Sequence, residues 1–185
     1  TLVDSSTWYA QGGIAAVIDE KDSTEDHLRD TLIAGDGLCN VEAVRECVSK
    51  GKEAIDWLSD IGTSFTRDKS SNNYHLTQEG GHSKRRVVHS EDATGKEVSS
   101  SLAEIVRSIS NIKVLENHIC VDLVTAKGRC VGAYVLDINT NEVKTFSSGS
   151  TIIATGGASK IYLYTSNPDG SSGDGIGLAW RAGCK

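Results

Sequence analysis

The chain has 185 residues, of which 38% are hydrophobic and 24% charged, and 25 Asp and Glu against 19 Lys and Arg give a net charge of −6. This acidic balance disfavours nucleic-acid-binding proteins, which usually carry a basic excess. No apolar run approaches the roughly 18 residues that cross a bilayer, and no basic segment with an apolar core marks a secretory signal. We therefore expect a cytoplasmic protein without a membrane anchor.

The length suits one domain of ordinary size or part of a larger one. Residue 1 is Thr and the sequence contains no Met. Because Thr1 is not a natural translation start, we interpret the sequence as a piece of a longer protein.

Helical periodicity dominates the first 110 residues. Ser23 is placed to cap a helix that Gly35 ends. A second helix is expected to begin after Asn40 and to stop at Gly62. A third follows a dense charged stretch and carries apolar residues at helical spacing over 94–109.

The pattern then changes to strands. The segment 151–154 is short, wholly apolar and followed by two glycines, as a buried central strand would be. A short helix is expected after Gly175. These features predict an α/β fold in which a β-meander precedes a buried strand. The expected strands are 112–115, 119–124, 130–138, 143–146 and 151–154, with a hairpin turn over 139–142.

The cysteines and histidines do not suggest a metal site. The five cysteines are widely spaced and form no CxxC pair, which favours buried free thiols in a reducing cytosol over a zinc site or a disulfide framework. His75, His82 and His89 recur every seven residues without a carboxylate partner at metal-ligand spacing. No metal is therefore expected.

Glycines occur in close pairs, which allow a backbone to approach a ligand. The loop Thr155-Gly156-Gly157 follows a predicted strand, where open α/β sheets bind ligands. Each pair alone is compatible with an ordinary turn, but together they favour an extended polar ligand such as a dinucleotide. Asp174 either caps the last helix or accepts a hydrogen bond from a ligand hydroxyl. The pairs are Gly12-Gly13, Gly80-Gly81, Gly156-Gly157 and Gly173 with Gly175.

The segment Glu79–His89 combines a glycine pair with a run of cations. Its arginines are suited to bidentate binding of a carboxylate or phosphate. A solvated charged loop is the alternative interpretation. A nucleic-acid patch is disfavoured, because the chain is acidic and no aromatic residues lie among the cations.

Five stretches resemble the L-aspartate oxidases, a family of the succinate dehydrogenase/fumarate reductase flavoprotein superfamily. The resemblance covers nearly the whole chain and implies an internal part, residues 1–185, of a Rossmann-like FAD-binding domain. The family's first βαβ unit with its GxGxxG loop, and its C-terminal capping domain, would lie outside it. The stretches are STWYAQGGIAAV (6–17), HLRDTLIAGDGLC (27–39), YHLTQEGGHSKRRVVHSEDATGKEV (74–98), ATGGASKIYLYTSNP (154–168) and SSGDGIGLAWRAGC (171–184).

The resemblance also implies where the cofactor binds. Ser6 stands where the membrane-complex members carry a His bonded covalently to the flavin, so noncovalent FAD is expected. The loop 6–13 is expected to surround the flavin and pyrophosphate, and the backbone of the residues at 119–120 to meet the adenine. The implied cofactor-binding residues are Ser6, Thr7, Trp8, Tyr9, Ala10, Gln11, Gly12, Gly13, Ile119, Cys120, Thr155, Gly156, Gly157 and Asp174.

Glu79 is the residue that the resemblance marks for substrate choice. In aspartate oxidases a Glu precedes this glycine pair and meets the substrate ammonium, whereas the dicarboxylate enzymes commonly carry an aromatic residue. The implied reaction oxidises L-aspartate to iminoaspartate, with oxygen or fumarate as electron acceptor. The product would pass to quinolinate synthase in de novo NAD biosynthesis.

Two alternatives to this function remain. One is a soluble fumarate reductase or succinate dehydrogenase-like flavoprotein. The other is a non-catalytic dinucleotide-binding module, which the missing GxGxxG loop favours. By itself the chain is expected to show no turnover and to bind FAD weakly or not at all.

Overall fold

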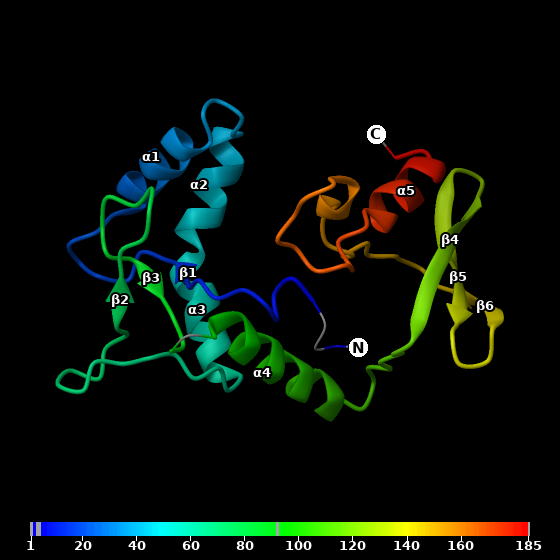
Figure 1. Ribbon diagram of the computed structural model, residues 1–185, viewed down its shortest axis with the longest axis horizontal. Coiled ribbons are helices and arrows are strands. Elements are labelled where there is room, and N and C mark those ends of the chain that lie inside the picture. The colour runs from blue at the N-terminus through cyan, green and yellow to red at the C-terminus, as the bar shows by residue number, and fades with distance from the viewer. Residues whose placement is uncertain (1, 3–4, 92, 185) are drawn as a thin grey trace. The chain divides into compact units, whose positions relative to one another are not determined.

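The computed structural model describes residues 2, 5–91 and 93–184. The chain divides into two compact units, which we call the helical unit (Thr7–Ser108) and the meander unit (Thr1–Ser6 with Ile109–Lys185). Figure 1 shows the elements of the helical unit in blue to green and those of the meander unit in yellow-green to red. Among the described residues, none of the helices is long and apolar enough to cross a membrane.

The helices of the helical unit are α1 (Thr24–Ala34), α2 (Val41–Ser49), α3 (Gly51–Asp60) and α4 (Thr94–Ser108). The predicted cap of α1 is confirmed, because the Ser23 side chain accepts a hydrogen bond from the Asp26 N–H. The expected single helix after Asn40 is wrong: the chain breaks at Lys50, which ends α2 and begins α3. A Cβ placed on Gly51 would lie 3.3 Å from the Ala16 Cβ, so a tertiary contact accompanies this break.

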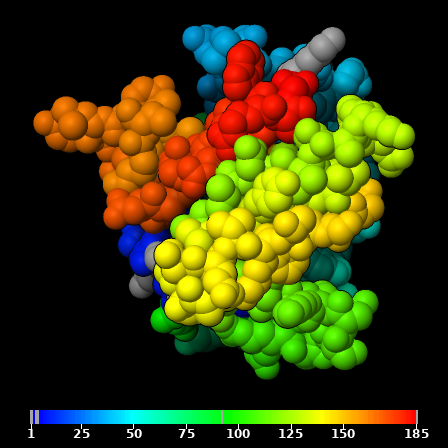
Figure 2. Space-filling model, turned by 90° about the vertical axis from the view of Figure 1, so that its right-hand side faces the viewer, coloured from blue at the N-terminus to red at the C-terminus, as the bar shows by residue number. Residues whose placement is uncertain are grey.

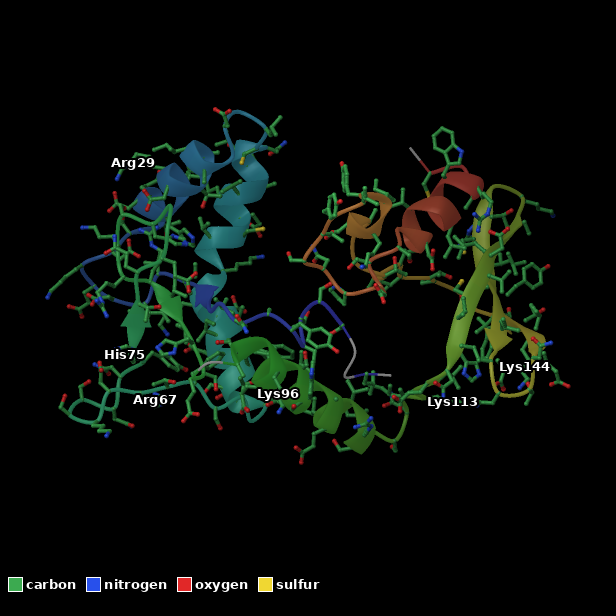
Figure 3. All side chains as sticks on the ribbon, in the orientation of Figure 1. Arg29, Arg67, His75, Lys96, Lys113 and Lys144 are labelled. Carbon is green, nitrogen blue, oxygen red and sulfur yellow. The ribbon has the colours of Figure 1, made fainter. Side chains whose placement is uncertain are left out.

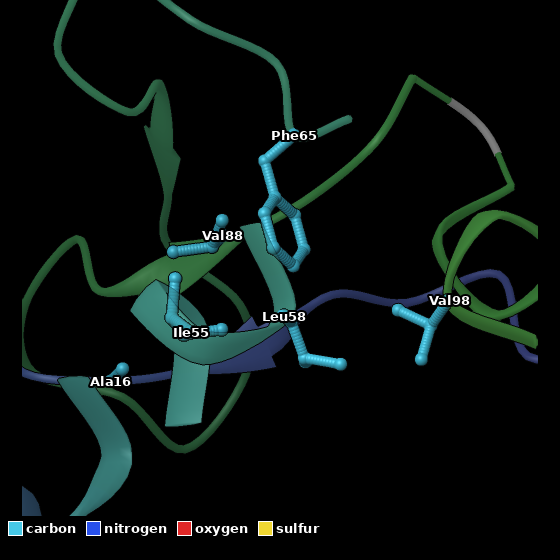
Figure 4. Packing of buried hydrophobic residues seen from close by; sticks show 6 residues of the cluster. All are labelled: Ala16, Ile55, Leu58, Phe65, Val88 and Val98. Atoms are coloured by element: carbon cyan, nitrogen blue, oxygen red, sulfur yellow. The ribbon is translucent and has the colours of Figure 1, made fainter. Parts of the chain in front are cut away.

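A small antiparallel sheet lies at the centre of the helical unit. Its strands are β1 (Ile14–Ala15), β2 (Leu76–Thr77) and β3 (Val87–Val88), in the order β1-β3-β2. The buried apolar cluster beside it combines residues from β3, α3, α4 and the connecting segments, so the unit has a core of its own (Figure 4). The cluster comprises Ala16, Ile55, Leu58, Phe65, Val88 and Val98.

The meander unit contains the predicted antiparallel meander. Its strands β4 (His118–Ala126), β5 (Arg129–Asp137) and β6 (Glu142–Ser147) pair in sequence order, so the predicted hairpin between the last two is confirmed. A 3₁₀ turn, η1 (Ser159–Ile161), and helix α5 (Asp174–Arg181) follow. Helix α5 lies beside β4, where Arg181 Nη2 donates a hydrogen bond to the Val121 carbonyl oxygen at 3.2 Å (Figure 2).

Two of the predicted strands are wrong. The segments 112–115 and 151–154 form no ladder with any described residue. The second is not buried either, because Ile152 is 90% exposed and Ile153 is 39% exposed. Their apolar, β-branched composition is typical of strands, but a strand also needs a neighbour that satisfies its backbone hydrogen bonds.

The fold is therefore a mixture of helix and antiparallel sheet. No parallel strand pair occurs among residues 5–91 and 93–184. The five thiols are free, but the expectation that they are buried is wrong, since Cys47 and Cys184 are exposed and the others are half-buried.

Candidate functional site

The loop Thr7–Gly13 lies directly on the N-terminus of α4. The Gly95 N–H donates to the Ala10 carbonyl oxygen at 3.1 Å, and the Lys96 ammonium lies 5.6 Å from the centre of the Trp8 ring. A Cβ on Gly95 would lie 1.8 Å from the Thr7 carbonyl oxygen, so only glycine permits this approach. Figure 3 shows Lys96 at this end of α4.

The same loop brings its glycine pair to β3 and to Glu79. A Cβ on Gly13 would lie 2.2 Å from the Val88 carbonyl oxygen, which leaves no room for a side chain. A Cβ on Gly12 would lie 3.8 Å from Glu79 Oε2. Two separate parts of the sequence, the loop expected to hold the flavin and the residue expected to choose the substrate, therefore lie together in the helical unit.

Glu79 opens a tight turn between β2 and β3. The His82 N–H donates to the Glu79 carbonyl oxygen at 3.2 Å, and Gly81 has φ +84°, the left-handed conformation that a type II turn requires at its third residue. Glu79 and both glycines are exposed. A Cβ on Gly80 or Gly81 would meet no protein atom within 4 Å, so there is space beside this backbone for a ligand.

The cations that follow Glu79 do not form one anion-binding set. The guanidinium of Arg86 is fully buried and donates two hydrogen bonds to Asp22, at 2.7 and 2.8 Å, and one to Asp30 at 2.7 Å. Both interpretations of the segment are therefore wrong for Arg86, because its charge is neither solvated nor available to a ligand. Arg85 is exposed and donates from Nε to the Leu76 carbonyl oxygen.

The buried carboxylate of Asp30 is strongly acidic. Burial would raise its pKa, but hydrogen bonds from the Ser83 N–H, the Ser83 hydroxyl and Arg86 outweigh that effect and lower the pKa to about 2. The hydrogen bonds that Arg86 donates to Asp22 raise the pKa of Arg86 in turn. The cluster therefore stays ionised at neutral pH.

The histidines form two close pairs. His75 Nδ1 lies 2.8 Å from His89 Nε2, and the rings of His27 and His82 meet edge to face with centroids 5.7 Å apart. Burial, with the nearby charge of Arg86, lowers the pKa of His27. Within the described residues, no group of three or more His, Cys, Asp and Glu is placed to hold a metal ion.

In the meander unit the loop Thr155-Gly156-Gly157 packs against the start of α5. The Gly173 N–H donates to the Gly157 carbonyl oxygen at 3.2 Å, and a Cβ on Gly175 would lie 2.0 Å from Thr155 Oγ1. Cβ atoms on Gly156 and Gly157 would meet nothing within 4 Å, so one side of the loop is open.

Asp174 is exposed and is the first residue of α5. The N-cap is Gly173, so the capping interpretation of Asp174 is wrong. A carboxylate in the first turn of a helix is stabilised by the exposed backbone N–H groups and the helix dipole. The position is compatible with hydrogen bonding to a ligand hydroxyl.

The remaining predicted cofactor residues also lie in the meander unit. Ile119 and Cys120 are on β4, where they pair with Leu136 and Val135, and the register shifts directly after Cys120. Burial, followed by the charge of Asp122, raises the pKa of the Cys120 thiol. The Ser6 hydroxyl lies 3.1 Å from the hydroxyl of buried Ser171.

A cavity of about 700 Å³ lies elsewhere in the helical unit. Its walls include Lys21, Arg67, His75 and Arg85 together with carboxylates, so it carries charges of both signs (Figure 3). None of the predicted site residues lines it. The predicted site is instead an open set of loops.

Comparisons with known proteins identify the family of the chain. The chain matches the family of the FAD binding domain over residues 2–185, and it belongs to that family. FAD is accordingly its cofactor. Within each unit, considered by itself, glycine loops leave backbone open to a ligand.

The most specific similarity is to L-aspartate oxidases. The chain is 50% identical to the L-aspartate oxidase of Pseudomonas aeruginosa, with 100% of this chain and 36% of the relative covered. It is also 50% identical to that of Vibrio cholerae, with 98% and 36% covered. The chain thus spans about a third of the length of these curated relatives.

Solved structures show the same fold. Sdh1 of Mycobacterium smegmatis is 27% identical with a TM-score of 0.93, covering 98% of this chain and 33% of the other. The E. coli quinol fumarate reductase subunit FrdA is 27% identical with a TM-score of 0.92, covering 96% and 30%. The chain therefore has a flavoprotein fold that succinate- and fumarate-processing proteins share.

Sequence reasoning missed the residues that support the Glu79 turn, namely Asp22, Asp30 and buried Arg86. One signal was available: Arg86 directly precedes the apolar pair Val87-Val88, where an inward-facing charge demands a buried counter-ion. The sequence did not show which carboxylates supply it.

Proposed function

We propose that this chain is the part of an FAD-dependent L-aspartate oxidase that binds the flavin and recognises the substrate amino group. The observation that carries the proposal is the carboxylate of Glu79 beside Gly12, in a chain 50% identical to L-aspartate oxidases. The Glu79 carboxylate lies next to the loop that the resemblance assigns to the flavin, and the identity to L-aspartate oxidases supports that assignment.

The proposed cofactor residues are those in the loop 6–13, Ile119 and Cys120 on β4, the loop 155–157 and Asp174. We expect noncovalent binding, because the Ser6 hydroxyl cannot form the histidyl–flavin bond. FAD supplies the hydride acceptor when it is bound. The protein supplies open backbone at the glycines and a domain of Rossmann-like type, to which this chain contributes one part.

Glu79 is proposed to hold the ammonium group of L-aspartate. Opposite charges in a site that excludes water attract more strongly than in bulk solvent, so this contact orients Cα toward the flavin. A substrate without the amino group would leave the carboxylate without a partner, which penalises succinate. With FAD bound, the Cα hydride would pass to the flavin and the ammonium group would give up a proton, which leaves iminoaspartate in its protonated form.

The proposed partners follow from this reaction. Oxygen or fumarate would reoxidise the flavin, and iminoaspartate would pass to quinolinate synthase for de novo NAD biosynthesis in the cytoplasm. The bases and anion-binding groups that complete the reaction are expected outside these 185 residues.

The test is the flavin absorbance of the full-length gene product under anaerobic conditions. L-aspartate is expected to bleach it, whereas succinate at the same concentration is not. Bleaching by succinate alone would instead support a dicarboxylate dehydrogenase. Absence of bound flavin would leave only a non-catalytic binding module.

A second test replaces Glu79. In Glu79→Gln, kcat/KM for L-aspartate is expected to fall about 10- to 100-fold, because a charge-assisted hydrogen bond is worth roughly 1.5–3 kcal/mol. Glu104→Gln, which changes an exposed carboxylate on α4, serves as the matched control. Equal activity of the two variants would refute the role of Glu79.

The structural neighbours favour a fumarate reductase-like flavoprotein as the second candidate, since FrdA shares this fold with a TM-score of 0.92. That likeness is to a fold common to both activities. The acidic residue at position 79 separates the candidates, and the succinate arm of the first test decides between them.

A further inference from the structure

We propose that Asp30 and Ser83 are positioning residues that hold the Glu79 turn in place and thereby set the preference for an amino dicarboxylate. This inference rests on the proposed function. Asp30 lies on α1, and Ser83 follows the glycine pair in the sequence. In the contacts described above, neither residue touches the loop Thr7–Gly13 or the carboxylate of Glu79.

The link between Asp30 and Ser83 consists of two hydrogen bonds. Asp30 Oδ2 accepts from the Ser83 N–H at 2.8 Å and from the Ser83 hydroxyl at 2.7 Å. The Asp30 side chain is only 8% exposed, so water competes poorly for these bonds. We call this pair of bonds the Asp30–Ser83 link.

Arg86 fixes the position of Asp30. Its Nη1 donates to the same Asp30 Oδ2, while Nε and Nη2 hold both oxygens of Asp22. Its backbone belongs to the sheet region, because its N–H donates to the Thr77 carbonyl oxygen and its own carbonyl oxygen accepts from the Ala16 N–H. The link is therefore anchored to a buried cation whose backbone and side chain are both held.

The middle of the turn that carries Glu79 has little support. A Cβ on Gly80 or Gly81 would meet no protein atom within 4 Å, so the middle of the turn packs against nothing. Its end is held by the Gln78 amide, which donates to the His82 carbonyl oxygen at 2.8 Å, and by the Asp30–Ser83 link. At the same end, the His82 ring also packs edge to face on His27, and His82 Nδ1 lies 3.4 Å from Arg86 Nη1. Both glycines carry high conformational entropy, so the orientation of Glu79 depends on these fixed ends.

The consequence is a selective effect on the amino group. When the link is weakened, the Glu79 carboxylate samples more positions and binds an ammonium less well. A dicarboxylate without an amino group makes no favourable contact with that carboxylate, so its binding is not weakened. Ser83→Ala removes one of the two hydrogen bonds and retains the backbone N–H, which makes it the milder perturbation.

The experiment measures the full-length gene product with FAD bound, in Ser83→Ala, Ser83→Thr and the control Ser49→Ala, whose lost hydroxyl donates to a helix carbonyl oxygen. Ser83→Ala is expected to raise KM for L-aspartate about threefold to tenfold, in line with one net hydrogen bond. The inhibition constant of succinate is expected not to rise, and the flavin spectrum is expected to stay unchanged. Ser83→Thr restores the hydroxyl and should restore KM.

A double-mutant cycle with Glu79→Gln completes the test. If Ser83 acts through Glu79, adding Ser83→Ala to Glu79→Gln has no further effect on KM. Additive effects, an unchanged KM in Ser83→Ala, or a parallel rise in the succinate inhibition constant would overturn the inference while leaving the proposed function intact. A wild-type protein that does not oxidise L-aspartate would overturn both.

Discussion

The helical unit and the meander unit differ in how much apolar surface each buries. The helical unit encloses an apolar cluster, whereas Leu178 is the one buried hydrophobic residue among the described residues of the meander unit. Large apolar side chains of the meander unit lie in the open instead. They include Ile152, Ile161, Tyr162, Leu163, Tyr164, Ile176 and Trp180, each at least 61% exposed.

The two units are therefore stabilised by different kinds of interaction. The helical unit buries part of its hydrophobic residues in a core of its own, although Ile33, Leu38 and Trp57 are exposed. The meander unit has local hydrogen bonding without a comparable core, and exposed apolar patches of this kind mark surfaces that another segment or partner covers. The two units should therefore respond differently to isolation and to mutation.

The largest expected effect concerns the chain by itself. Expressed as 185 residues, it is expected to show no turnover, to bind FAD weakly or not at all, and to enhance the fluorescence of ANS through the exposed apolar residues of the meander unit. Absorbance after gel filtration with FAD, and ANS titration against the full-length gene product, measure this. A stoichiometric yellow complex of the 185-residue chain would contradict the prediction.

Glycine substitutions test the same contrast within the full-length protein. Gly95→Ala in the helical unit forces a Cβ to within 1.8 Å of a backbone oxygen that cannot move away. We therefore expect the free energy of unfolding to fall by about 3 kcal/mol and the bound FAD to be lost. Gly175→Ala in the meander unit places a Cβ against the side chains of Thr155 and Ile153, which can rotate. The free energy of unfolding is therefore expected to fall by only about 1 kcal/mol.

Urea unfolding and flavin content of the purified proteins give both quantities. Gly149→Ala is the matched control, because its Cβ would meet no atom within 4 Å. If the free energy of unfolding falls equally in the two test variants, the helical unit accommodates an added Cβ as readily as the meander unit does.

The elements that the sequence predicts correctly depend on short-range interactions. The Ser23 cap acts within three residues, and the hairpin of β5 and β6 closes across a short turn. The predicted strand 151–154 fails because β propensity does not provide a neighbouring strand. The helical pattern does not predict the break at Lys50, because the break accompanies a contact between Gly51 and Ala16, which are far apart in sequence.

The candidate site also contains residues that the sequence predicts and residues that it does not. Glycine patterns and the resemblance point to the proposed flavin loop and to Glu79, and the structure brings Gly12 and Glu79 together. The buried support from Asp30 and Arg86 is not predictable from spacing, because 56 residues separate the two partners. Sequence patterns thus identify the exposed groups better than the buried groups that orient them.

The pH dependence of stability distinguishes a carboxylate paired with a buried cation in one unit, Asp30, from a carboxylate paired with a half-exposed cation in the other, Asp137. The pKa of Asp30 is lowered from 3.8 to about 2, so its ionised form stabilises the folded state above pH 4. That stabilisation, about 2 kcal/mol, is lost as the pH falls from about 4 to about 2. Asp30→Asn should therefore differ most from wild type above pH 4 and converge with it toward pH 2.

Asp137 in the meander unit gives the smaller, matching effect. The Lys144 ammonium donates to it at 3.0 Å and, with the Asn139 N–H, lowers its pKa despite partial burial (Figure 3). Because Lys144 is half-exposed, water and salt weaken this pair. Asp137→Asn is thus expected to show the same sign as Asp30→Asn, with a stabilisation by the carboxylate that is lost as the pH falls through its lowered pKa and a smaller amplitude that 0.5 M NaCl reduces further. Urea midpoints measured from pH 5 to pH 2 test this, and an amplitude equal to that of Asp30→Asn would show that the meander unit shields its ion pairs as well as the helical unit does.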